Sequence, residues 1–560
     1  MILKRLAEFA TRKEALPPMY QKARVKWLID LDANGRLVGS GFVPLTGGDL
    51  RGRDRGREMV VPHVGRTVKI VAKLLADNAE YVLGTGDDPK AIERHRAFCE
   101  RVERCSEETG EPCVKAVLAF LREAGDKAAL LPEEAEDGDV FTFRVHGQLP
   151  VDLPSVKAFW ARETMGAGTT MECLVCVQVK PVEERLPLKI KGIPGGQMSG
   201  TALISANSEA FESYGLSASL IAPTCRECGE AFANAANQMI RSDQHHLRVG
   251  PTMFLFWTRE QAVFNPASLL SDPQEEDVKR LVDSYRTGAR DLRTDADSFY
   301  ALSLSASGGR VVVRDWLDTT VPTAQANLAS WFGLQRIVDA NSGAIGSYYG
   351  VWWLATSLYI REKAKEQMVA NVPRALVRCA LHGGPLPNWI LAQAVARNRA
   401  EQGVTRNRAA LTKAVLLSQL HDYEEDHMER LDETCKSPGY LCGRLLAELE
   451  AAQYQAVRPS STLVDRFYGA ASASPAIVFG SLLRNLQAHM AKLRRDRPAV
   501  YRAIDNRIQD ITSELGEFPK TLNLKEQALF ALGYYHEKAA NRTAAIAHAT
   551  AQEEEEDELR

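Results

Sequence analysis

Long hydrophobic runs are missing from this sequence. The longest apolar stretch, residues 348–360, is too short to span a bilayer, which needs about 20 residues. The first residues mix Lys4, Arg5, Arg12 and Lys13 with apolar side chains and contain no apolar core or small-residue cleavage site, so they do not resemble a secretory signal. We therefore expect a cytoplasmic protein without membrane contact, in which the ten cysteines are reduced or bound to metal.

Common catalytic and nucleotide-binding motifs are also missing. The sequence has no G-x-x-x-x-G-K-[ST], no H-E-x-x-H and no G-x-S-x-G, which argues against a P-loop, a zinc protease of that type and a nucleophile elbow. One cluster does favour catalysis: His421 lies one helical turn before Glu425, with Asp422 and His427 nearby, a geometry able to hold a divalent ion. A nuclease would need further ligands from other segments, so a metal-dependent nuclease stays an alternative function.

The net charge of -3 hides strong local asymmetry, because six acids at residues 553–558 mask basic patches upstream. Residues 484–507 contain seven cations and two acids. Three basic sets are candidate contacts to nucleic-acid phosphates: Arg51, Arg53, Arg55 and Arg57; Arg397, Arg399, Arg406, Arg408 and Lys413; and Arg484, Lys492, Arg494, Arg495 and Arg497. The alternative is that the first set is a solvated linker and the others are solvated helix faces.

The N-terminal part predicts mixed structure. Residues 26–31 and 37–43 flank Asn34-Gly35, which favours a hairpin with a two-residue type I′ turn. The glycine-rich loop that carries the first arginine set follows. Lys69 and Asn78 come next, and the Asn side chain is able to read base edges, although ordinary turn hydrogen bonding is an equal interpretation. A helical pattern covers residues 92–131.

The middle part is rich in predicted strands. Residues 171–179 and 254–257 are expected to be strands, and residues 300–315 form the clearest hairpin, which turns at residues 307–309. A glycine run at residues 192–200 lacks the strand, the spacing and the helix of a dinucleotide motif. It suits close approach of backbone to a ligand, and its candidate contacts are Gly195, Gly196, Gln197 and Ser199.

Two cysteine pairs have zinc-knuckle spacing. Cys173-x-x-Cys176 and Cys225-x-x-Cys228 would supply four thiolates for a tetrahedral structural Zn²⁺ site. The gap between the pairs is much longer than in compact zinc ribbons. The alternative is that Cys173 and Cys176 are core thiols of an apolar strand.

The pattern is helical from Thr323 onward. In the last part, Leu441, Leu445, Leu446 and Leu449 lie on one face, and a second apolar face runs through residues 479–490. The fold class is therefore α+β, a mixed strand-containing N-terminal region followed by an all-α region that ends in a helical bundle. We expect four parts, at residues 1–150, 151–322, 323–427 and 428–560.

Several segments together resemble one family. Residues 299–305 (FYALSLS) and 310–316 (RVVVRDW) are similar to the hallmark strand pair of the large subunit of type I-C CRISPR surveillance complexes (Cascade). Further segments that agree, in order, are residues 74–84, 189–200, 210–215, 443–445 and 527–536. The chain departs from the family at residues 305–308 and in having the pair Cys225 and Cys228, so zinc chemistry is not transferred from relatives.

The resemblance implies a binding protein without catalytic activity. In such complexes guide RNA reads the target by base pairing, as in other RNA-guided effectors. The large subunit would recognise a short protospacer-adjacent motif on double-stranded target DNA, start strand separation, and contact the guide RNA–target duplex, the backbone and guide-end subunits and the small subunit. A separately recruited helicase-nuclease would cut. A structural scaffold without DNA contact is the remaining alternative.

Asn78 with Lys69, and Gln197 with Ser199, are our candidates for reading the motif. The basic sets are candidates for binding phosphate. Type I-C relatives are thought to make their small subunit from an internal start, and Met428 begins a segment that would suit this product.

Overall fold

The computed structural model describes residues 2–13, 16–17, 19–46, 56–64, 66, 70–86, 90–123, 128–164, 169–206, 208–260, 264–287, 297–420 and 428–558. The chain forms two compact units. The first comprises Met1–Gly192, Gly196–Gln238 and Gly308–Val311, and the second comprises Ile193–Gly195, Met239–Ser307 and Val312–Arg560. Sheets precede an all-helical region, so the predicted α+β class is confirmed. The four-part division stays a prediction.

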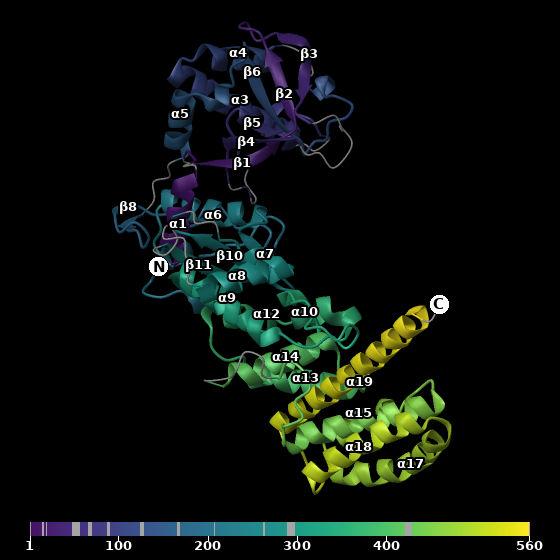
Figure 1. The fold of residues 1–560 in the computed structure, drawn as a ribbon. Helices are drawn as coiled ribbons and strands as arrows, with labels where there is room; N and C mark the ends of the chain where they lie inside the picture. The colour runs from purple at the N-terminus through teal and green to yellow at the C-terminus, as the bar shows by residue number, and fades with distance from the viewer. Residues whose placement is uncertain are drawn as a thin grey trace. The chain divides into compact units, whose positions relative to one another are not determined.

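The first unit contains a four-stranded sheet covered by helices (Figure 1). Its strand order is β3 (Leu37–Pro44), β2 (Trp27–Leu31), β6 (Val140–Val145) and β5 (Ala76–Asn78). β2 pairs parallel to β6, and the other pairs are antiparallel. Its helices include α2 (Ala79–Val82), α3 (Lys90–Thr109), α4 (Pro112–Arg122) and α5 (Pro154–Thr164), which confirms the predicted helical pattern after residue 92. Phe143 packs between Phe98 of α3 and Phe120 of α4 and anchors the core.

The predicted hairpin between β2 and β3 is present, but its predicted two-residue turn is wrong. Asp32 N–H donates to the Arg36 carbonyl at 2.9 Å, and Gly35 N–H donates to the Asp32 carbonyl at 3.1 Å. Three residues therefore form the loop, and Gly35 alone among them has positive φ, at 82°. The Asp32 carboxylate explains the difference, because it accepts from the Asn34 and Arg36 N–H groups and stabilises the wider loop.

The remaining elements of the first unit are small strand pairs and isolated helices. They are α1 (Ile2–Lys13), β1 (Tyr20–Val25) paired with β4 (Arg57–Pro62), β7 (Thr170–Glu172) paired with β8 (Val179–Pro181), and α6 (Arg226–Arg241). The predicted continuous strand over residues 171–179 is wrong, since residues 173–178 form a turn. Val177 has φ 59°, and its N–H donates to the Cys173 carbonyl at 2.8 Å.

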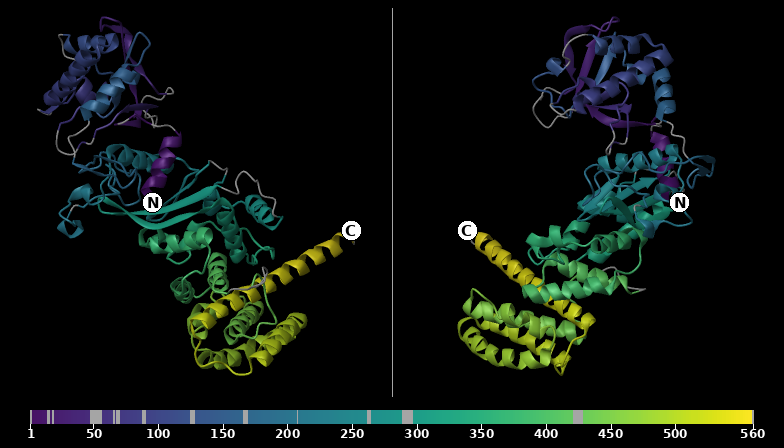
Figure 2. Two further views of the ribbon diagram at one scale, coloured as in Figure 1. Left: turned by 90° about the vertical axis from the view of Figure 1, so that its left-hand side faces the viewer. Right: turned by 180° about the vertical axis from the view of Figure 1, so that it is seen from behind.

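The second unit begins with an antiparallel sheet in the order β12 (Arg310–Thr320), β11 (Ser298–Ser307), β10 (Thr252–Thr258) and β9 (His246–Val249). The predicted strand at residues 254–257 lies in β10, and the predicted hairpin is β11–β12; both are confirmed. The long hairpin strands stand out in the left view of Figure 2. Phe254, Phe256 and Phe299 lie in one core with the helices that follow.

The rest of the second unit is helical, and the predicted helical pattern from Thr323 onward is confirmed. Its helices are α7 (Pro266–Ser271), α8 (Glu275–Thr287), α9 (Val321–Gln335), α10 (Val351–Thr356), α11 (Ala364–Gln367), α12 (Asn371–His382), α13 (Asn388–Glu401), α14 (Arg406–Ser418), α15 (Pro438–Val457), α16 (Val464–Ala471), α17 (Pro475–Asp496), α18 (Pro498–Leu515) and α19 (Leu524–Glu558). α7 and α8, which precede this pattern, are not among the predicted helices. α15 to α18 form the predicted bundle, with α19 beside α15 (Figures 1 and 2). No helix among the described residues is long and apolar enough to cross a membrane.

Glycines allow α15 and α19 to approach closely. A Cβ added to Gly443 would lie 2.1 Å from the Phe530 carbonyl oxygen, and one added to Gly533 would lie 2.2 Å from the Tyr440 carbonyl oxygen. Beside this contact Arg444 binds the buried carboxylate of Glu537 at 2.7 Å. The family-like segments at residues 443–445 and 527–536 therefore pack against each other.

Candidate nucleic-acid interface

Residues 190–201, which contain the glycine run, form a closed loop. Ile190 and Thr201 exchange backbone hydrogen bonds of 2.9 and 2.8 Å. The buried Asn237 of α6 also fixes the base of the loop: its Oδ1 accepts from the Lys191 N–H at 2.8 Å, and its Nδ2 donates to the Lys189 carbonyl at 3.0 Å. The loop therefore begins and ends on a rigid base.

The tip of this loop is open to solvent. Gln197 and Ser199 are exposed, and Met198 is fully exposed. Gly195 has φ 73°, and a Cβ added there would meet nothing within 4 Å. The backbone and the polar side chains of this tip are thus open to solvent, and their contact with a ligand stays a prediction.

Two further segments of the first unit adjoin the loop. A Cβ added to Gly309 would lie 3.3 Å from Gln197, so the turn between β11 and β12 lies beside the loop tip. The Arg310 guanidinium lies 4.1 Å from the ring centroid of the half-exposed Phe211. Sequence analysis missed this cation–π pair, although both residues lie in family-like segments.

Asn78 begins α2 beside a buried carboxylate. Asp77 is fully buried; its Oδ1 accepts from the Asn78 N–H at 2.9 Å, and its carboxylate also pairs with Arg66 and contacts Lys73 at 3.9 Å. Asn78 Oδ1 is buried and has no hydrogen-bond partner within the part of the chain that the structure describes. Sequence analysis had no signal for Arg66 or for the organising role of Asp77, because both depend on tertiary contacts.

Charges from the Asn78 segment and from the base of the glycine loop both act on His63. His63 Nε2 lies 3.2 Å from the Pro187 carbonyl. Burial is the main cause that lowers the pKa of His63, to about 4, and the charges of Lys73, Lys191 and Arg66 lower it further. Burial also lowers the pKa of Lys73, an effect that Asp77 opposes and Arg66 and Lys191 reinforce. The charges of Lys73 and Arg66, which lie against Asp77, and of Lys191, at the base of the glycine loop, thus act on the same histidine.

The first arginine set is mostly outside the described residues, as are Lys69 and the possible nuclease cluster of His421, Asp422 and His427. Arg57 is the described member of the set. It is exposed at the end of β4, opposite Val25 of β1.

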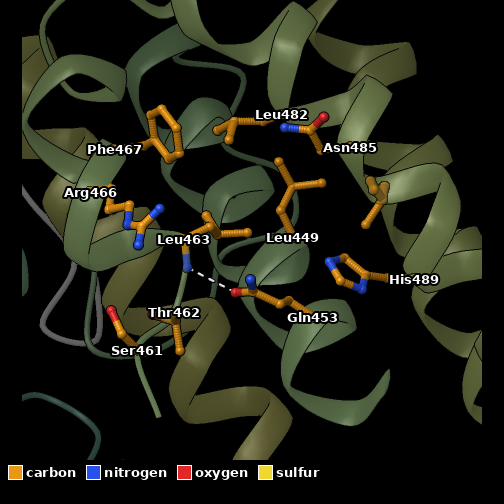
Figure 3. A pocket seen from close by; sticks show the side chains of 11 residues that line it. Leu449, Gln453, Ser461, Thr462, Leu463, Arg466, Phe467, Leu482, Asn485 and His489 are labelled. Atoms are coloured by element: carbon orange, nitrogen blue, oxygen red, sulfur yellow. Dashed lines mark hydrogen bonds between the residues drawn. The ribbon is translucent and has the colours of Figure 1, made fainter. Parts of the chain in front are cut away.

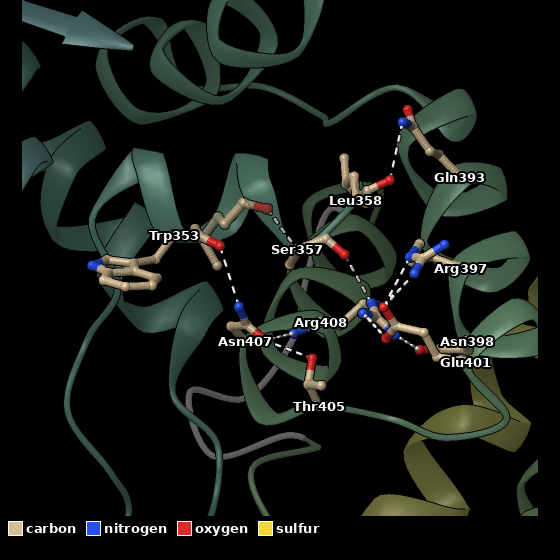
Figure 4. A network of polar contacts seen from close by, with 11 residues as sticks. Trp353, Ser357, Leu358, Gln393, Arg397, Asn398, Glu401, Thr405, Asn407 and Arg408 are labelled. Carbon is tan, nitrogen blue, oxygen red and sulfur yellow. Dashed lines mark hydrogen bonds and ion pairs between the residues drawn. The ribbon is translucent and has the colours of Figure 1, made fainter. Parts of the chain in front are cut away.

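The second basic set is not the exposed face that we expected. Arg408 is 3% exposed and donates to the Ser357 carbonyl at 2.9 Å, to Asn398 Oδ1 at 3.0 Å and to Glu401 at 2.5 Å (Figure 4). Lys413 is completely buried, and its ammonium donates to the Arg336 carbonyl at 2.5 Å. The prediction that Arg408 and Lys413 contact nucleic acid is therefore wrong, because both stabilise the helical core instead.

Two other members of this set are engaged in ion pairs. Arg397 binds Glu401 at 2.6 Å, and Arg406 binds Asp339 at 3.3 Å. Burial raises the pKa of Glu401, but Arg408 and Arg397 outweigh it and hold that pKa below its usual value. Arg399 alone of the five is exposed.

The third basic set is exposed on α17 and at the start of α18, as predicted. Arg495 pairs with Asp496 at 2.7 Å, and Arg497 donates to Gln455 at 2.6 Å. Arg484 and Lys492 have no side-chain partner among the described residues. Arg507, at the end of the predicted patch, turns inward and binds the buried Glu448 at 3.0 Å.

A pocket of about 310 Å³ opens between α15, α16 and α17 (Figure 3). Leucines and Phe467 line it together with polar side chains, which include Arg466, Asn485 and His489. Burial lowers the pKa of His489, and the charge of Lys492 lowers it further, so the imidazole is neutral at pH 7. The pocket and the two unpaired cations share α17.

The four predicted zinc ligands come together. Their sulfur atoms all lie within 4.8 Å of one another, although the two pairs are far apart in sequence. Burial raises the pKa of Cys225 and Cys228. Burial acts the same way on Cys173, but N–H groups of Cys176, Cys225 and Val175 outweigh it and lower its pKa to about 7. The interpretation of Cys173 and Cys176 as strand thiols is wrong, because both lie in the turn after β7.

One family model matches almost the whole chain. It is described as CRISPR-associated protein (Cas_Csd1), and the match covers residues 3–541. No curated protein matches the chain.

Proposed function

Since the chain belongs to the CRISPR-associated protein family Cas_Csd1, we propose that it is the non-catalytic large subunit of a type I-C surveillance complex (Cascade). It recognises the protospacer-adjacent motif on duplex DNA and stabilises the R-loop, while guide RNA reads the target sequence. Its partners are the backbone, guide-end and small subunits, and a separately recruited helicase-nuclease cuts the DNA. In this proposal the four cysteines hold a structural zinc ion and take no part in chemistry.

The observation that carries the proposal is the exposed polar tip of the glycine loop, which stands on a base fixed by Asn237 and has Lys191 beside it. Gln197 offers an exposed side-chain amide able to donate to and accept from base edges, and Asn78 has a buried amide oxygen without a hydrogen-bond partner among the described residues. Lys191 is exposed at the base of the glycine loop, and Lys73 and Arg66 are near enough to affect the same histidine. Cations beside unpaired polar groups suit a DNA duplex, whose phosphates fix position while its base edges give specificity.

Two surfaces serve affinity in this proposal. Lys191 and Arg310 bind phosphates near the motif, and Arg484 and Lys492 on α17 bind the nucleic acid of the R-loop. Such contacts weaken with salt, since each phosphate contact releases counterions.

The test is a mobility-shift comparison with the assembled complex on duplexes that carry the correct or a scrambled motif. Gln197→Ala should reduce the preference for the correct motif by roughly tenfold, because one lost base contact costs about 1–3 kcal/mol. Asn78→Ala should act in the same direction.

Two controls make the comparison specific. Gln148→Ala removes an exposed side chain of the same type from another turn of the first unit and should change nothing. Lys492→Ala should weaken both duplexes equally. If Gln197→Ala weakens binding to both duplexes equally, the glycine loop does not read the motif.

A structural scaffold without DNA contact is excluded if the isolated chain binds duplex DNA at low salt. Divalent-metal-dependent cleavage by the purified chain that His421→Ala abolishes would favour the nuclease alternative.

A further inference from the structure

We propose that Cys173, Cys176, Cys225 and Cys228 bind one Zn²⁺ ion, and that this ion fixes the base of the glycine loop through α6. The zinc ion is part of the proposed function, and its coupling to the glycine loop goes beyond that function; neither depends on motif reading. Only the consequence for motif reading rests on that function.

The sulfur geometry suits a single four-coordinate ion. Zn²⁺ with four thiolates at about 2.3 Å places the sulfur atoms about 3.8 Å apart in a tetrahedron. Cys176 Sγ and Cys225 Sγ lie 3.9 Å apart, and all pairs lie within 4.8 Å. An iron–sulfur cluster would hold its thiolates farther apart, because the cluster itself lies between them.

The backbone around the first pair is already folded for a ligand. The turn after β7 is closed by Cys173 N–H donating to the Gln178 carbonyl at 2.9 Å, and Val177 takes the left-handed conformation at φ 59°. The Cys225 N–H points at Cys173 Sγ at 3.3 Å. An amide donor to sulfur stabilises a thiolate that is bound to metal.

The second pair lies at the start of a helix. Cys225 immediately precedes α6, and Cys228 lies in its first turn, where helix N–H groups favour negative charge. Val182, after β8, forms an isolated β-bridge with Cys225, and the Leu174 N–H donates to the Pro223 carbonyl at 2.9 Å. The two pairs are therefore held together by backbone contacts on both sides.

The site lies in a small core of its own. Cys173 and Cys225 are buried, and Leu3 and Ala7 of α1 pack against them with Val175. Few apolar side chains take part, so four thiols alone would stabilise this region poorly. A metal ion supplies the missing cross-link, as in other small domains with sparse cores.

α6 connects this site to the glycine loop. The helix begins at the second cysteine pair and later carries Asn237, whose amide binds both Lys189 and Lys191 at the base of the loop. Gly229, next to Cys228, is in close contact with Leu186, since a Cβ there would lie 2.6 Å from Leu186 Cδ2. Fixing the start of α6 thus fixes the segment that enters the loop.

The first test is metal content. The purified chain should contain about one zinc ion, and the Co²⁺-substituted protein should show the visible absorption of a tetrahedral thiolate site. Cys176→Ser and Cys228→Ser change the two less buried ligands and should each abolish stoichiometric zinc. Cys99→Ser changes a cysteine outside the cluster and should retain it.

A wild-type chain without stoichiometric zinc, whose four thiols react freely after addition of Zn²⁺, would overturn the metal site. This measurement needs no variant, so poor folding of a serine variant does not affect it.

The second test is hydrogen exchange of residues 189–201 before and after removal of zinc with a chelator. Exchange at the loop base should become about tenfold faster or more without metal, as expected for local opening. Asn237→Ala should give the same increase while zinc stays bound. Unchanged exchange after metal loss would overturn the coupling to the loop.

The two tests above can succeed or fail independently of DNA binding, which tests the proposed function. Neither zinc content nor hydrogen exchange involves DNA, so both hold if the chain has no role in motif reading. If motif reading is confirmed, zinc removal should reduce motif preference to the level of Gln197→Ala.

Discussion

At the scale of single residues, burial decides which cations are exposed to solvent and so open to a binding partner. Arg399 and Lys413 come from the same basic run, yet Arg399 is exposed and Lys413 is completely buried. Lys413 donates to the Arg336 carbonyl, so it serves the helical core. A charge in the sequence therefore marks a binding surface only when its side chain reaches solvent.

Arg399→Ala should therefore change the salt dependence of DNA binding but not stability, and Lys413→Ala should change stability but not the salt dependence. If Arg399 contacts phosphate, its loss lowers the slope of log K against log salt by about 1 and changes stability by less than about 0.5 kcal/mol. Lys413→Ala should leave the slope unchanged and lower the free energy of unfolding by about 2 kcal/mol, because it leaves a cavity and an unpaired carbonyl. Salt titration and denaturant unfolding measure the two effects, and a lower slope for Lys413→Ala would contradict this account.

At the scale of elements, the α15–α19 contact depends on glycine. Gly443→Ala places a methyl group within 2.1 Å of the Phe530 carbonyl oxygen, so we expect a loss of about 2 kcal/mol in unfolding free energy. Gly480→Ala in α17 is the matched control, because a Cβ there meets nothing within 4 Å. It should be neutral or stabilise by up to about 1 kcal/mol. Equal effects in thermal unfolding would show that the two helices do not approach so closely.

The same contact predicts a pH dependence. His536 is buried against Tyr440, and its Nδ1 lies 3.0 Å from the tyrosine oxygen. Burial, together with the charge of Lys413, lowers the pKa of His536 to about 3, and the charge of Asp432 opposes this shift. Below about pH 6.5 the unfolded chain therefore binds a proton that the folded chain does not, and stability falls as pH falls towards 3. The difference in unfolding free energy between wild type and His536→Gln should change by up to about 1.4 kcal/mol per pH unit between pH 6 and 4.5. A constant difference over this range would show that His536 is not kept neutral by the fold.

Sequence reasoning succeeds for these elements where the signal is local. The hairpin over residues 300–315 follows from alternating side chains and two glycines, and the apolar faces of α15 and α17 follow from helical spacing. It fails at the turn between β2 and β3, where the neighbouring Asp32 carboxylate stabilises a wider loop than Asn-Gly indicates. It also fails at residues 173–178, which form a turn that contacts the distant Pro223 and Cys225. At the candidate site the roles of Asn78 and Gln197 stay predictions, and the sequence could not indicate Asp77, which acts through tertiary contacts with Arg66 and Lys73.

At the scale of the whole molecule, the C-terminal bundle shares its last helix with the preceding helices. Ala528, Leu529 and Leu532 of α19 lie in the core that contains α12 to α14, whereas Phe530 and Tyr534 lie in the bundle core. Glu429, directly after Met428, pairs with Arg336 at 2.8 Å. A free product of residues 428–560 would expose Ala528, Leu529 and Leu532, so we expect it to be stable only when it is bound to a partner.

Replacing the Met428 codon by one that cannot initiate should remove a short C-terminal product from the purified complex. The same change at Met490, within α17, should not. Immunodetection of a C-terminal tag provides the measurement. A short product that persists without Met428 would exclude this position as its start.

Motif reading by the glycine loop is tested most directly by photo-cross-linking. A photoreactive amino acid at Gln197, in the assembled complex on a matched target duplex, should cross-link to nucleotides of the protospacer-adjacent motif and lose most of this product when the motif is scrambled. The same group at Gln148 should give no motif-dependent product. Cross-links from position 197 that ignore the motif, or an absence of DNA cross-links in a complex that still binds its target, would contradict the account.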